Sequence, residues 1–368
     1  MSSFKDVSQY SICPKFCQRT CLIDCQPYII IELTIKSNNC NIISLRERTY
    51  MKEKIIYFLR NTTGFLSGEE ISKSLSLSRS AVWKHITRLR EEGYKIEAVS
   101  HRGYRLVTCP DKLLPDIIKT GLETKIIGCD IICYDSAEST MDIASQKAFS
   151  GSPEGLVVCA ETQTKGRGRL GRQWSSPKGK GLYFSIVLRP KVLLHEISGL
   201  TLLMSVAVSK AIKKICDISV KIKWPNDLIV DQKKVAGILT ELNGEVDRIN
   251  FVVVGIGINV NESKRFLPKA ATSLFNQSGK KILRVKLLQE ILKEIERYYA
   301  LFQDQGFAPI LDEWRDLSET LGKHVRVIQS SGVVEGRAVD VDGQGALLVE
   351  QEDKTIIKRT SGEIIHLR

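Results

Sequence analysis

The sequence predicts an α+β fold built from three domains. Residues 51–109 carry helical patterns followed by two alternating segments, residues 110–318 mix strands and helices, and residues 319–368 hold short strands divided by turn residues. A chain of 368 residues is too long for one ordinary hydrophobic core. We therefore expect each of these three regions to fold around a core of its own.

Residues 1–50 precede these domains, and we expect them to be a disordered extension whose translation in vivo is doubtful. The first four cysteines repeat every fourth residue, a spacing at which thiols on one helical face could bind a soft metal. No matching His or Cys-x-x-Cys pair accompanies them, so we expect no structural metal. The codons of residues 46–48 can form a purine-rich run that resembles a ribosome-binding site, which favours Met51 as the true start.

Charge and cysteine usage limit the class of protein. The formal charge of +12 suggests a polyanionic partner without identifying one. The cysteines beyond residue 50 are scattered, which is typical of buried thiols in a reducing cytoplasm. No apolar run reaches the roughly 18 residues that a membrane-spanning helix needs. We expect a cytoplasmic protein with no membrane partner.

The first domain has the pattern of two short helices, a tight turn and two strands. Ser67-Gly68-Glu69-Glu70 is a capping box that starts a helix ending near Leu75. Ser78 can cap the next helix, which Gly93 stops. Residues 94–99 and 103–107 then alternate as two strands. This order predicts a helix-turn-helix with a β wing over residues 51–109.

A winged helix-turn-helix predicts DNA binding, although such modules also serve in protein interaction and dimerisation. Residues 51–107 hold eleven Lys or Arg against six Glu. The second helix of the motif presents its N-terminal half to base edges, and wing residues Arg102 and Arg105 can hold phosphates. The DNA contacts are expected within Gly68 to Thr87, foremost from Ser78, Arg79, Ser80, Lys84 and His85.

The central domain contains a loop rich in arginine and glycine. Residues 166–174 read Gly-Arg-Gly-Arg-Leu-Gly-Arg-Gln-Trp. The glycines match the dinucleotide fingerprint, but residues 175–181 contain Pro and Gly and break the helix that this fingerprint requires. Guanidinium groups match phosphate and carboxylate, so the loop is predicted to close over an anion. An exposed basic turn and a nonspecific nucleic-acid patch are the alternatives.

Other segments of the central domain combine turns with buried strands. Residues 113–122 are expected to be helical, and residues 125–127 to form a strand. Ser139 and Thr140 lie at a turn from strand to helix, where they can bind a polar ligand or, for Ser139, simply cap the helix. The glycines of the buried strand 251–259 indicate close approach of backbone or ligand. A long helix with Glu290, Glu294 and Arg297 on its polar face is expected to be scaffold.

Taken together, these motifs resemble those of biotin protein ligases in their order along the chain. The motifs are Ser139-Thr140, Gln163, the loop 166–174, Lys223-Trp224-Pro225-Asn226-Asp227, residues 234–239 and residues 255–259. With a winged helix in front and a small β domain behind, the resemblance covers residues 51–368. It is closest to the bifunctional type, a biotin ligase that is also the biotin operon repressor. The resemblance implies a class II synthetase-like catalytic domain and an SH3-like C-terminal domain.

The resemblance also implies a two-step reaction and roles for individual residues. Biotin attacks the α-phosphate of ATP to give biotinoyl-adenylate and pyrophosphate, and a carrier-protein lysine then attacks the mixed anhydride. Lys234 and Arg169 are the expected catalytic residues, and the arginine–glycine loop is expected to close over the adenylate. The full substrate-binding set is Ser139, Thr140, Met141, Gln163, Gly166, Arg167, Gly168, Arg169, Arg172, Trp174, Lys234, Gly237, Gly255, Gly257 and Asn259.

Cofactors and partners follow from the same resemblance. Mg²⁺ is expected to accompany ATP, held mainly by phosphate oxygens and water, with Asn226 and Asp227 as possible helpers. The expected partners are a biotin carboxyl carrier domain, operator DNA and, with adenylate bound, a second copy of the chain. The alternatives are a biotin-sensing regulator without ligase activity, a lipoate ligase, and a ligase whose winged helix no longer binds DNA. The end of the chain departs from the family by one residue, which leaves the nucleotide contacts of Glu363 and Arg368 open.

Overall fold

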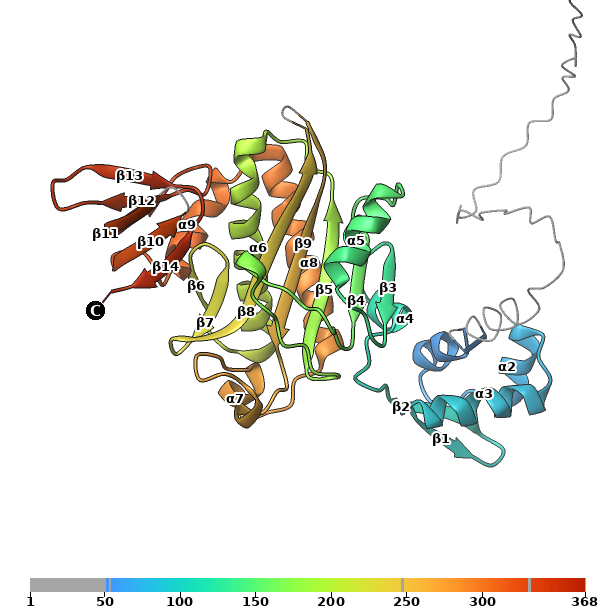
Figure 1. Cartoon of the computed structure of the whole chain (residues 1–368). Helices are drawn as coiled ribbons and strands as arrows, with labels where there is room; N and C mark the ends of the chain where they lie inside the picture. The colour runs from blue at the N-terminus through green and yellow to red at the C-terminus, as the bar shows by residue number, and fades with distance from the viewer. Residues whose placement is uncertain (1–50, 53, 246–247, 330–331, 368) are drawn as a thin grey trace, which may run out of the picture. The chain divides into compact units, whose positions relative to one another are not determined.

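The structure is a computed structural model that describes residues 51–52, 54–245, 248–329 and 332–367 (Figure 1). The expectations for residues 1–50 and for Arg368 lie outside the described residues. Among the residues described, no helix is long and apolar enough to cross a membrane.

The first domain is a winged helix-turn-helix, as predicted. After helical residues 54–61, its elements are α2 (Gly68–Leu75), α3 (Arg79–Glu91), β1 (Lys95–Val99) and β2 (Gly103–Thr108). The capping box is formed, because the Glu70 N–H donates to Ser67 Oγ (3.0 Å) and the Ser67 N–H donates to Glu70 Oε2 (2.9 Å). Ser78 caps α3 by accepting from the Ala81 N–H at 3.1 Å.

The wing is attached to the helices through Leu66. Leu66 and Tyr104 exchange two backbone hydrogen bonds of 2.8 Å, which adds a third strand-like segment to the β1–β2 hairpin. Gly103 makes this approach possible: its φ is +102°, and a Cβ there would lie 2.1 Å from the Leu66 carbonyl oxygen. The wing is therefore fixed to the turn before α2.

The central domain is built on a seven-stranded sheet. Only its first pair, β3 with β4, is parallel among the described strands, and the remaining neighbours are antiparallel. In sheet order the strands are β3 (Ile131–Tyr134), β4 (Val157–Ala160), β5 (Gly181–Leu188), β9 (Ile249–Asn259), β8 (Lys233–Gly244), β7 (Asp227–Val230) and β6 (Lys221–Lys223).

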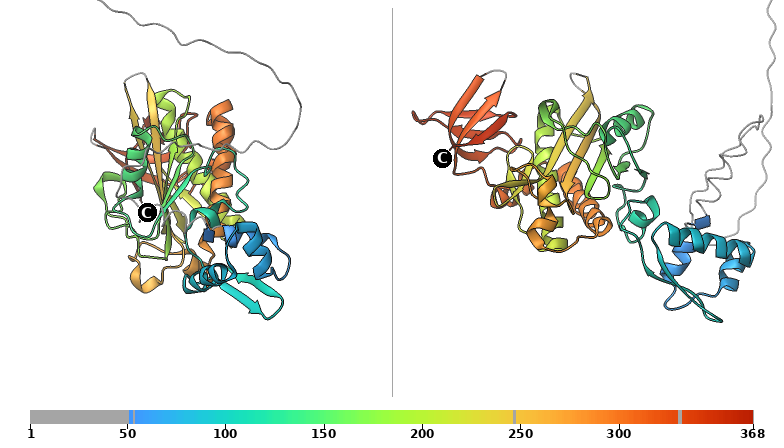
Figure 2. Two further views of the ribbon diagram at one scale, coloured as in Figure 1. Left: turned by 90° about the vertical axis from the view of Figure 1, so that its right-hand side faces the viewer. Right: turned by 60° about the horizontal axis from the view of Figure 1, so that its bottom comes forward.

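Helices cover both faces of this sheet (Figure 2). Helices α6 (Ile197–Cys216) and α8 (Arg284–Gln305) pack on each other and on one face, and α5 (Thr140–Phe149) packs on the other. Strand β9 shows why both faces close: Phe251 and Val253 pack with the α5 cluster, whereas Val252 and Val254 pack in the large core. The α8 residues expected to be scaffold take that role, since Glu290 pairs with Lys214 and Glu294 with Arg297.

The segment before β3 corrects two predictions. The helix expected over residues 113–122 is only α4 (Pro115–Lys119), and residues 125–127 form two bends and the start of a turn rather than a strand. The carboxylate of Glu296 on α8 accepts the three consecutive backbone N–H groups of residues 125–127 at 2.6, 2.7 and 2.8 Å. These groups are satisfied by a side chain 169 to 171 positions away, so no strand partner is needed.

The C-terminal domain follows α9 (Ala308–Leu317) and is an antiparallel sheet of five strands. This agrees with the small β domain that was predicted. In sheet order the strands are β13 (Ile356–Arg359), β12 (Leu347–Glu350), β11 (Gly332–Val341), β10 (His324–Gln329) and β14 (Glu363–His366). Two short elements elsewhere are η2 (Leu194–Glu196) and α7 (Leu274–Ser278).

Candidate functional site

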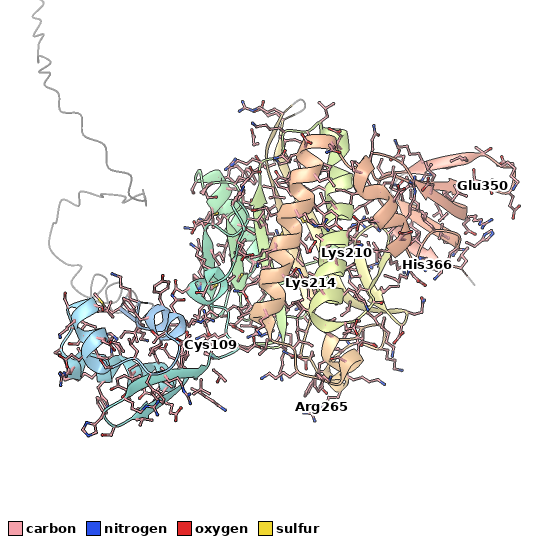
Figure 3. The ribbon with its side chains drawn as sticks, turned by 180° about the vertical axis from the view of Figure 1, so that it is seen from behind. Cys109, Lys210, Lys214, Arg265, Glu350 and His366 are labelled. Atoms are coloured by element: carbon pink, nitrogen blue, oxygen red, sulfur yellow. The ribbon has the colours of Figure 1, made fainter. Side chains whose placement is uncertain are left out.

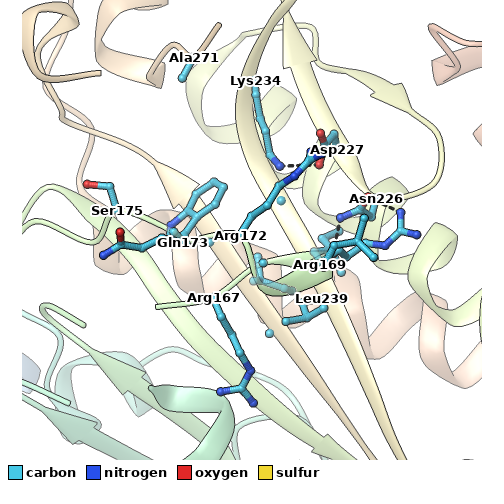
Figure 4. Close-up of a pocket in the computed structure, with 18 of the residues that line it drawn as sticks. Arg167, Arg169, Arg172, Gln173, Ser175, Asn226, Asp227, Lys234, Leu239 and Ala271 are labelled. Atoms are coloured by element: carbon cyan, nitrogen blue, oxygen red, sulfur yellow. Dashed lines mark hydrogen bonds and ion pairs between the residues drawn. The ribbon is translucent and has the colours of Figure 1, made fainter. Parts of the chain in front are cut away.

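A cavity of about 420 Å³ lies where the arginine–glycine loop, the central sheet and the C-terminal sheet meet (Figure 4). Strands β8 and β9 and the first turn of α5 line it from the sheet side. The loop 166–174 covers it, residues 267–271 form a further wall, and residues 362–364 reach it from the C-terminal domain. The cavity is large enough for a small organic ligand.

The loop folds back on itself without opening a helix. The Gly168 N–H donates to the Arg172 carbonyl (2.7 Å), and the Trp174 N–H donates to the Gly166 carbonyl (2.9 Å). The only helical turn within it is the short η1 (Arg169–Gly171). The dinucleotide fingerprint is thus excluded, as predicted, because no helix N-terminus follows its last glycine.

Trp174 forms an aromatic wall that two glycines accommodate. A Cβ at Gly257 would lie 2.6 Å from the Trp174 ring, and one at Gly237 would lie 3.3 Å from it. The ammonium of Lys234 lies 5.4 Å from the ring centroid, within reach of a cation–π interaction. The indole N–H is buried without a hydrogen-bond acceptor among the described residues, and a ligand oxygen would satisfy it.

Lys234 is held at the cavity from two sides. Its Nζ lies 2.6 Å from Asp227 Oδ1, and about a third of its side chain is exposed. Its backbone pairs with the opposite wall: its N–H donates to Ala270 O, and its carbonyl accepts from the Thr272 N–H, both at 2.9 Å. The second bond and Asn259, whose amide donates to Thr272 O at 3.1 Å, fix residues 267–272 beside the ammonium.

Arg169 adds a second cation to the same cavity. Its Nη1 donates to Asn226 Oδ1 at 3.2 Å, and the Asn226 amide in turn donates to the Ile238 carbonyl at 2.8 Å. Burial lowers the pKa of the Arg169 guanidinium below its ordinary value. A partly buried cation paired only with a neutral amide is suited to an anionic ligand.

Arg172 connects the loop to the C-terminal sheet. Its Nη2 lies 2.5 Å from Glu363 Oε1 on β14, and the guanidinium lowers the pKa of the Glu363 carboxyl. The Glu363 side chain thus takes part in the cavity through the loop arginine. Arg368, the other terminal residue whose contacts were open, lies outside the described residues.

Arg167 is oriented differently from the other two arginines. Its guanidinium makes two hydrogen bonds to Glu241 (3.0 and 2.9 Å) and one to Asp142 (2.6 Å). It also donates to Ser139 Oγ at 3.2 Å. Ser139 makes no side-chain cap to α5, so the capping alternative is not what the structure has. Arg167 is occupied by carboxylates and fixes the loop to β8 and α5.

A chain of hydroxyl and amide groups lies at the start of α5. Gln163 Oε1 accepts from both the N–H (2.8 Å) and Oγ1 (3.0 Å) of Thr140. Thr140 Oγ1 also lies 2.8 Å from Ser185 Oγ, and Gln163 Nε2 donates to Ser176 Oγ at 3.1 Å. Nearby, a Cβ at Gly255 would lie 2.4 Å from Met141 Sδ, so Met141 closes the apolar side of this end. The arrangement suits a ligand with one polar ring edge.

The structure brings nearly all of the predicted site residues together. Of the predicted set, Gly166 alone does not line the cavity in the described part of the chain; a Cβ there would lie 2.7 Å from the Trp174 carbonyl oxygen, so the loop turn needs it. The prediction missed residues 267–271, which carry no motif and are placed at the site by the pairing with Lys234 and by the Asn259–Thr272 hydrogen bond. The predicted residues that line the cavity are Ser139, Thr140, Met141, Gln163, Arg167, Gly168, Arg169, Arg172, Trp174, Asn226, Asp227, Lys234, Gly237, Gly255, Gly257 and Asn259.

The side chains offer no ready metal site. No group of three or more His, Cys, Asp or Glu side chains within the described ranges is arranged to hold a metal ion. Asp227 is paired with Lys234, and Asn226 Oδ1 already accepts from Arg169. A divalent cation here would need ligand oxygens and water for most of its coordination.

The winged helix presents a second basic surface. Ser78, Ser80 and Lys84 are exposed on or beside α3, and Arg79 is exposed but pairs with Glu69 at 2.7 Å. His85 is only half-exposed. The two wing arginines lie against an aromatic ring: the guanidinium carbons of Arg102 and Arg105 are 4.6 and 4.8 Å from the Phe65 centroid. Arg105 also pairs with Glu97 at 2.6 Å.

Family models match each of the three domains. The biotin/lipoate A/B protein ligase family matches residues 134–259, an HTH domain matches residues 52–105, and the biotin protein ligase C-terminal domain matches residues 320–367.

Named relatives and a solved structure agree. The bifunctional ligase/repressor BirA of Bacillus subtilis is 41% identical over 309 residues, covering 83% of this chain and 95% of the relative. BirA of Escherichia coli is 32% identical over 322 residues, covering 86% and 96%. The biotin protein ligase of Aquifex aeolicus in complex with biotin and ATP superposes with a TM-score of 0.57 at 32% identity, covering 65% of this chain and all of that one.

Proposed function

The chain belongs to the family of bifunctional biotin ligase/repressors. We propose that biotinoyl-adenylate is formed in its cavity and that the adenylate-bound protein binds DNA through its winged helix. The chain is an ATP-dependent biotin protein ligase that transfers biotin to a lysine of a carrier domain, and it acts as a biotin-responsive repressor. The roles of individual residues are our proposal.

The observation that carries the proposal is the position of Lys234. Its ammonium lies above Trp174 and is fixed by Asp227 and by the wall 267–272. In the first step a carboxylate oxygen of biotin bonds to the α-phosphorus of ATP, the bond from phosphorus to the bridging oxygen breaks, and pyrophosphate leaves. A cation between the two anionic groups reduces their repulsion as they meet. We assign this role to Lys234.

The loop arginines have two proposed roles: one binds the phosphate of the ligand, and the other two hold the loop in place. Arg169 is partly buried and, within the part of the chain that the structure describes, its guanidinium pairs only with the Asn226 amide, which supports a direct contact with the phosphate of the adenylate. Arg172 forms an ion pair with Glu363, and this pair can keep the loop closed over the ligand. Because Arg167 is saturated by Glu241 and Asp142, we propose that it anchors the loop and does not touch phosphate. A closed loop excludes the water that would hydrolyse the mixed anhydride.

The biotin end is assigned to the hydroxyl and amide chain. Thr140, Gln163 and Ser185 form a polar edge next to the apolar surface of Met141. An ureido ring offers both donors and an acceptor to such an edge, while its fused ring and tail need apolar walls. Trp174 on Gly257 supplies one wall, and its unpaired indole N–H can donate to a ligand oxygen.

In the second step the amine of the carrier lysine attacks the carbonyl carbon of the adenylate. The new bond is an amide, the bond from the carbonyl to the phosphate oxygen breaks, AMP leaves, and the amine gives up a proton. Mg²⁺ would reach the site with ATP, with oxygens of phosphate and water completing its coordination.

We also propose that the protein works in the cytoplasm, where its carrier and operator are found.

Repression is proposed to depend on the adenylate. Two winged helices must bind one symmetric operator together, so we infer that the adenylate-bound chain forms a two-fold dimer. The α3 surface and the Phe65-supported arginines of the wing would contact DNA.

One incubation tests both activities. The protein is mixed with biotin, ATP and a biotin carboxyl carrier domain, the mass of the carrier is measured, and an operator shift is run with and without carrier. We expect biotinylated carrier, and an operator shift that needs biotin and ATP and weakens when carrier consumes the adenylate. Carrier of unchanged mass would contradict the ligase assignment, and a shift independent of biotin would contradict the proposed switch.

A further inference from the structure

The segment between β9 and α8 has a strongly basic outer surface. Residues 261–283, called the cationic segment below, include η3 (Lys264–Phe266) and α7. Their one acid, Glu262, is 5% exposed and accepts from the Ser263 N–H. Within the described residues, five exposed cations of the segment make no ion pair: Lys264, Arg265, Lys269, Lys280 and Lys281.

The inner side of the same segment is part of the cavity. Leu267, Pro268, Ala270 and Ala271 line it, and two backbone hydrogen bonds of 2.9 Å join the segment to Lys234. The cations Lys264 and Arg265 precede these lining residues, and Lys269 lies between Pro268 and Ala270, but none of the three lines the cavity. Figure 3 shows Arg265 beside α7 at the edge of the central domain. These three cations therefore lie beside one wall of the cavity without entering it.

An exposed aromatic side chain accompanies the charges. Phe266 is 64% exposed, and the Arg265 guanidinium lies 4.5 Å from its ring centroid. Stacking holds both side chains, so less conformational entropy is lost when a partner covers them. Aromatic and arginine side chains are enriched at protein interfaces, whereas a purely solvated face needs neither.

We propose that the cationic segment is the docking surface for an acidic face of the carrier domain. This rests on the proposed function, because the second step requires a folded protein to bring its lysine to the mouth of the cavity. Small anions are met inside by Lys234 and Arg169, which leaves the outward cations without a small-molecule task. For DNA, helix α3 and the β1–β2 wing of the first domain already provide the proposed binding surface. An acidic protein surface is the complementary partner that the site itself needs.

The test compares two variants with the same change of charge. Arg265→Glu/Lys269→Glu alters the cationic segment. Lys147→Glu/Lys191→Glu is the control, because both lysines are exposed and lack an ion pair among the described residues. Both lie near the Leu188 end of β5, since Arg189 donates to the carbonyl of Ala148, next to Lys147, and Lys191 follows two residues later. The cationic segment follows Asn259, which pairs with the opposite end of β5 at Gly181.

The measurement is single-turnover transfer from preformed enzyme–adenylate complex to increasing concentrations of apo carrier domain, at low and high salt. Pyrophosphate release is measured separately, before carrier is added. We expect the second-order rate constant for biotin transfer by Arg265→Glu/Lys269→Glu to fall about tenfold at low salt and to approach the wild-type value at high salt. Pyrophosphate release stays at the wild-type rate, and the control variant transfers normally.

Three results would overturn the proposal. First, Arg265→Glu/Lys269→Glu could transfer biotin as fast as the control variant. Second, its pyrophosphate release could fall in parallel with transfer. Third, its operator affinity could fall while transfer is unchanged, which would make the cationic segment a nucleic-acid surface. A wild-type protein that releases no pyrophosphate with biotin and ATP would overturn the proposed function first, and that result is seen before any carrier is present.

Discussion

Arg172 of the arginine–glycine loop and Glu363 of strand β14 form an ion pair 2.5 Å long across the cavity. It joins two parts of the chain that are 191 residues apart, so the loop that covers the cavity rests on the C-terminal domain. Through this pair, and by lining the cavity, Glu363 belongs to the site although it is far from the other site residues in sequence.

Replacing Glu363 with Gln should loosen the loop. The pair is exposed, so we expect a loss of stability of less than about 1 kcal/mol. The adenylate should nevertheless dissociate several-fold faster, because the loop loses its support. Dissociation is measured by chasing labelled adenylate from the complex. Glu350→Gln, on strand β12 of the same sheet but away from the cavity, serves as control. Equal dissociation rates for the two variants would show that the pair does not hold the loop.

Lys234→Ala should lower adenylate formation by about 10² to 10³-fold, since one cation at the developing charge is lost. The fold should remain, because the side chain is a third exposed and its backbone bonds are kept. Lys233→Ala is the matched neighbour, which makes no ion pair among the described residues. Circular dichroism and biotin-dependent pyrophosphate release separate folding from chemistry. Near-normal release in Lys234→Ala would remove this residue from the proposed role.

Gly257→Ala should damage the biotin site. The added Cβ would lie 2.6 Å from Trp174 Cε2, so the indole must move away from the cavity wall. Overpacking of this kind costs about 1 to 3 kcal/mol. We expect weaker biotin binding by calorimetry and a lower melting temperature. Gly343→Ala meets nothing within 4 Å and should leave both unchanged. Unaltered biotin affinity in Gly257→Ala would mean that Trp174 is not part of the binding wall.

Phe65→Leu should weaken operator binding, although we do not expect the Phe65 side chain itself to contact DNA. The ring supports both Arg102 and Arg105, and each stacked pair is worth about 0.5 to 1 kcal/mol at an exposed site. A loss of a few-fold in affinity is expected, with the salt dependence retained. Arg102→Ala, by contrast, removes a phosphate contact and should lower the salt slope by about 1. The two slopes are read from binding titrations at several salt concentrations, and identical slopes would contradict the distinction.

The parts of the structure that sequence predicted well depend on local chemistry. The capping box of Ser67 with Glu70 and the cap of Ser78 each involve only four consecutive residues, and both formed. The glycines at 255 and 257 marked close approach, and Met141 and Trp174 are what approach them.

The errors involve partners distant in sequence. The expected strand at 125–127 had apolar residues but lost its backbone donors to Glu296 on α8. The wall 267–271 joins the site through a pairing with Lys234 that no local pattern announces. Arg167 lines the cavity with the other loop arginines, but its hydrogen bond to Glu241, 74 positions away, is a contact that the loop motif alone does not predict.

Biotin-dependent exchange of labelled pyrophosphate into ATP tests the central claim most directly, because it requires reversible formation of the adenylate and nothing from carrier or DNA. We predict exchange by the wild-type protein that depends on biotin and Mg²⁺, is not supported by lipoate, and is lost in Lys234→Ala. Absence of exchange in the wild type, or exchange with lipoate in place of biotin, would contradict the account.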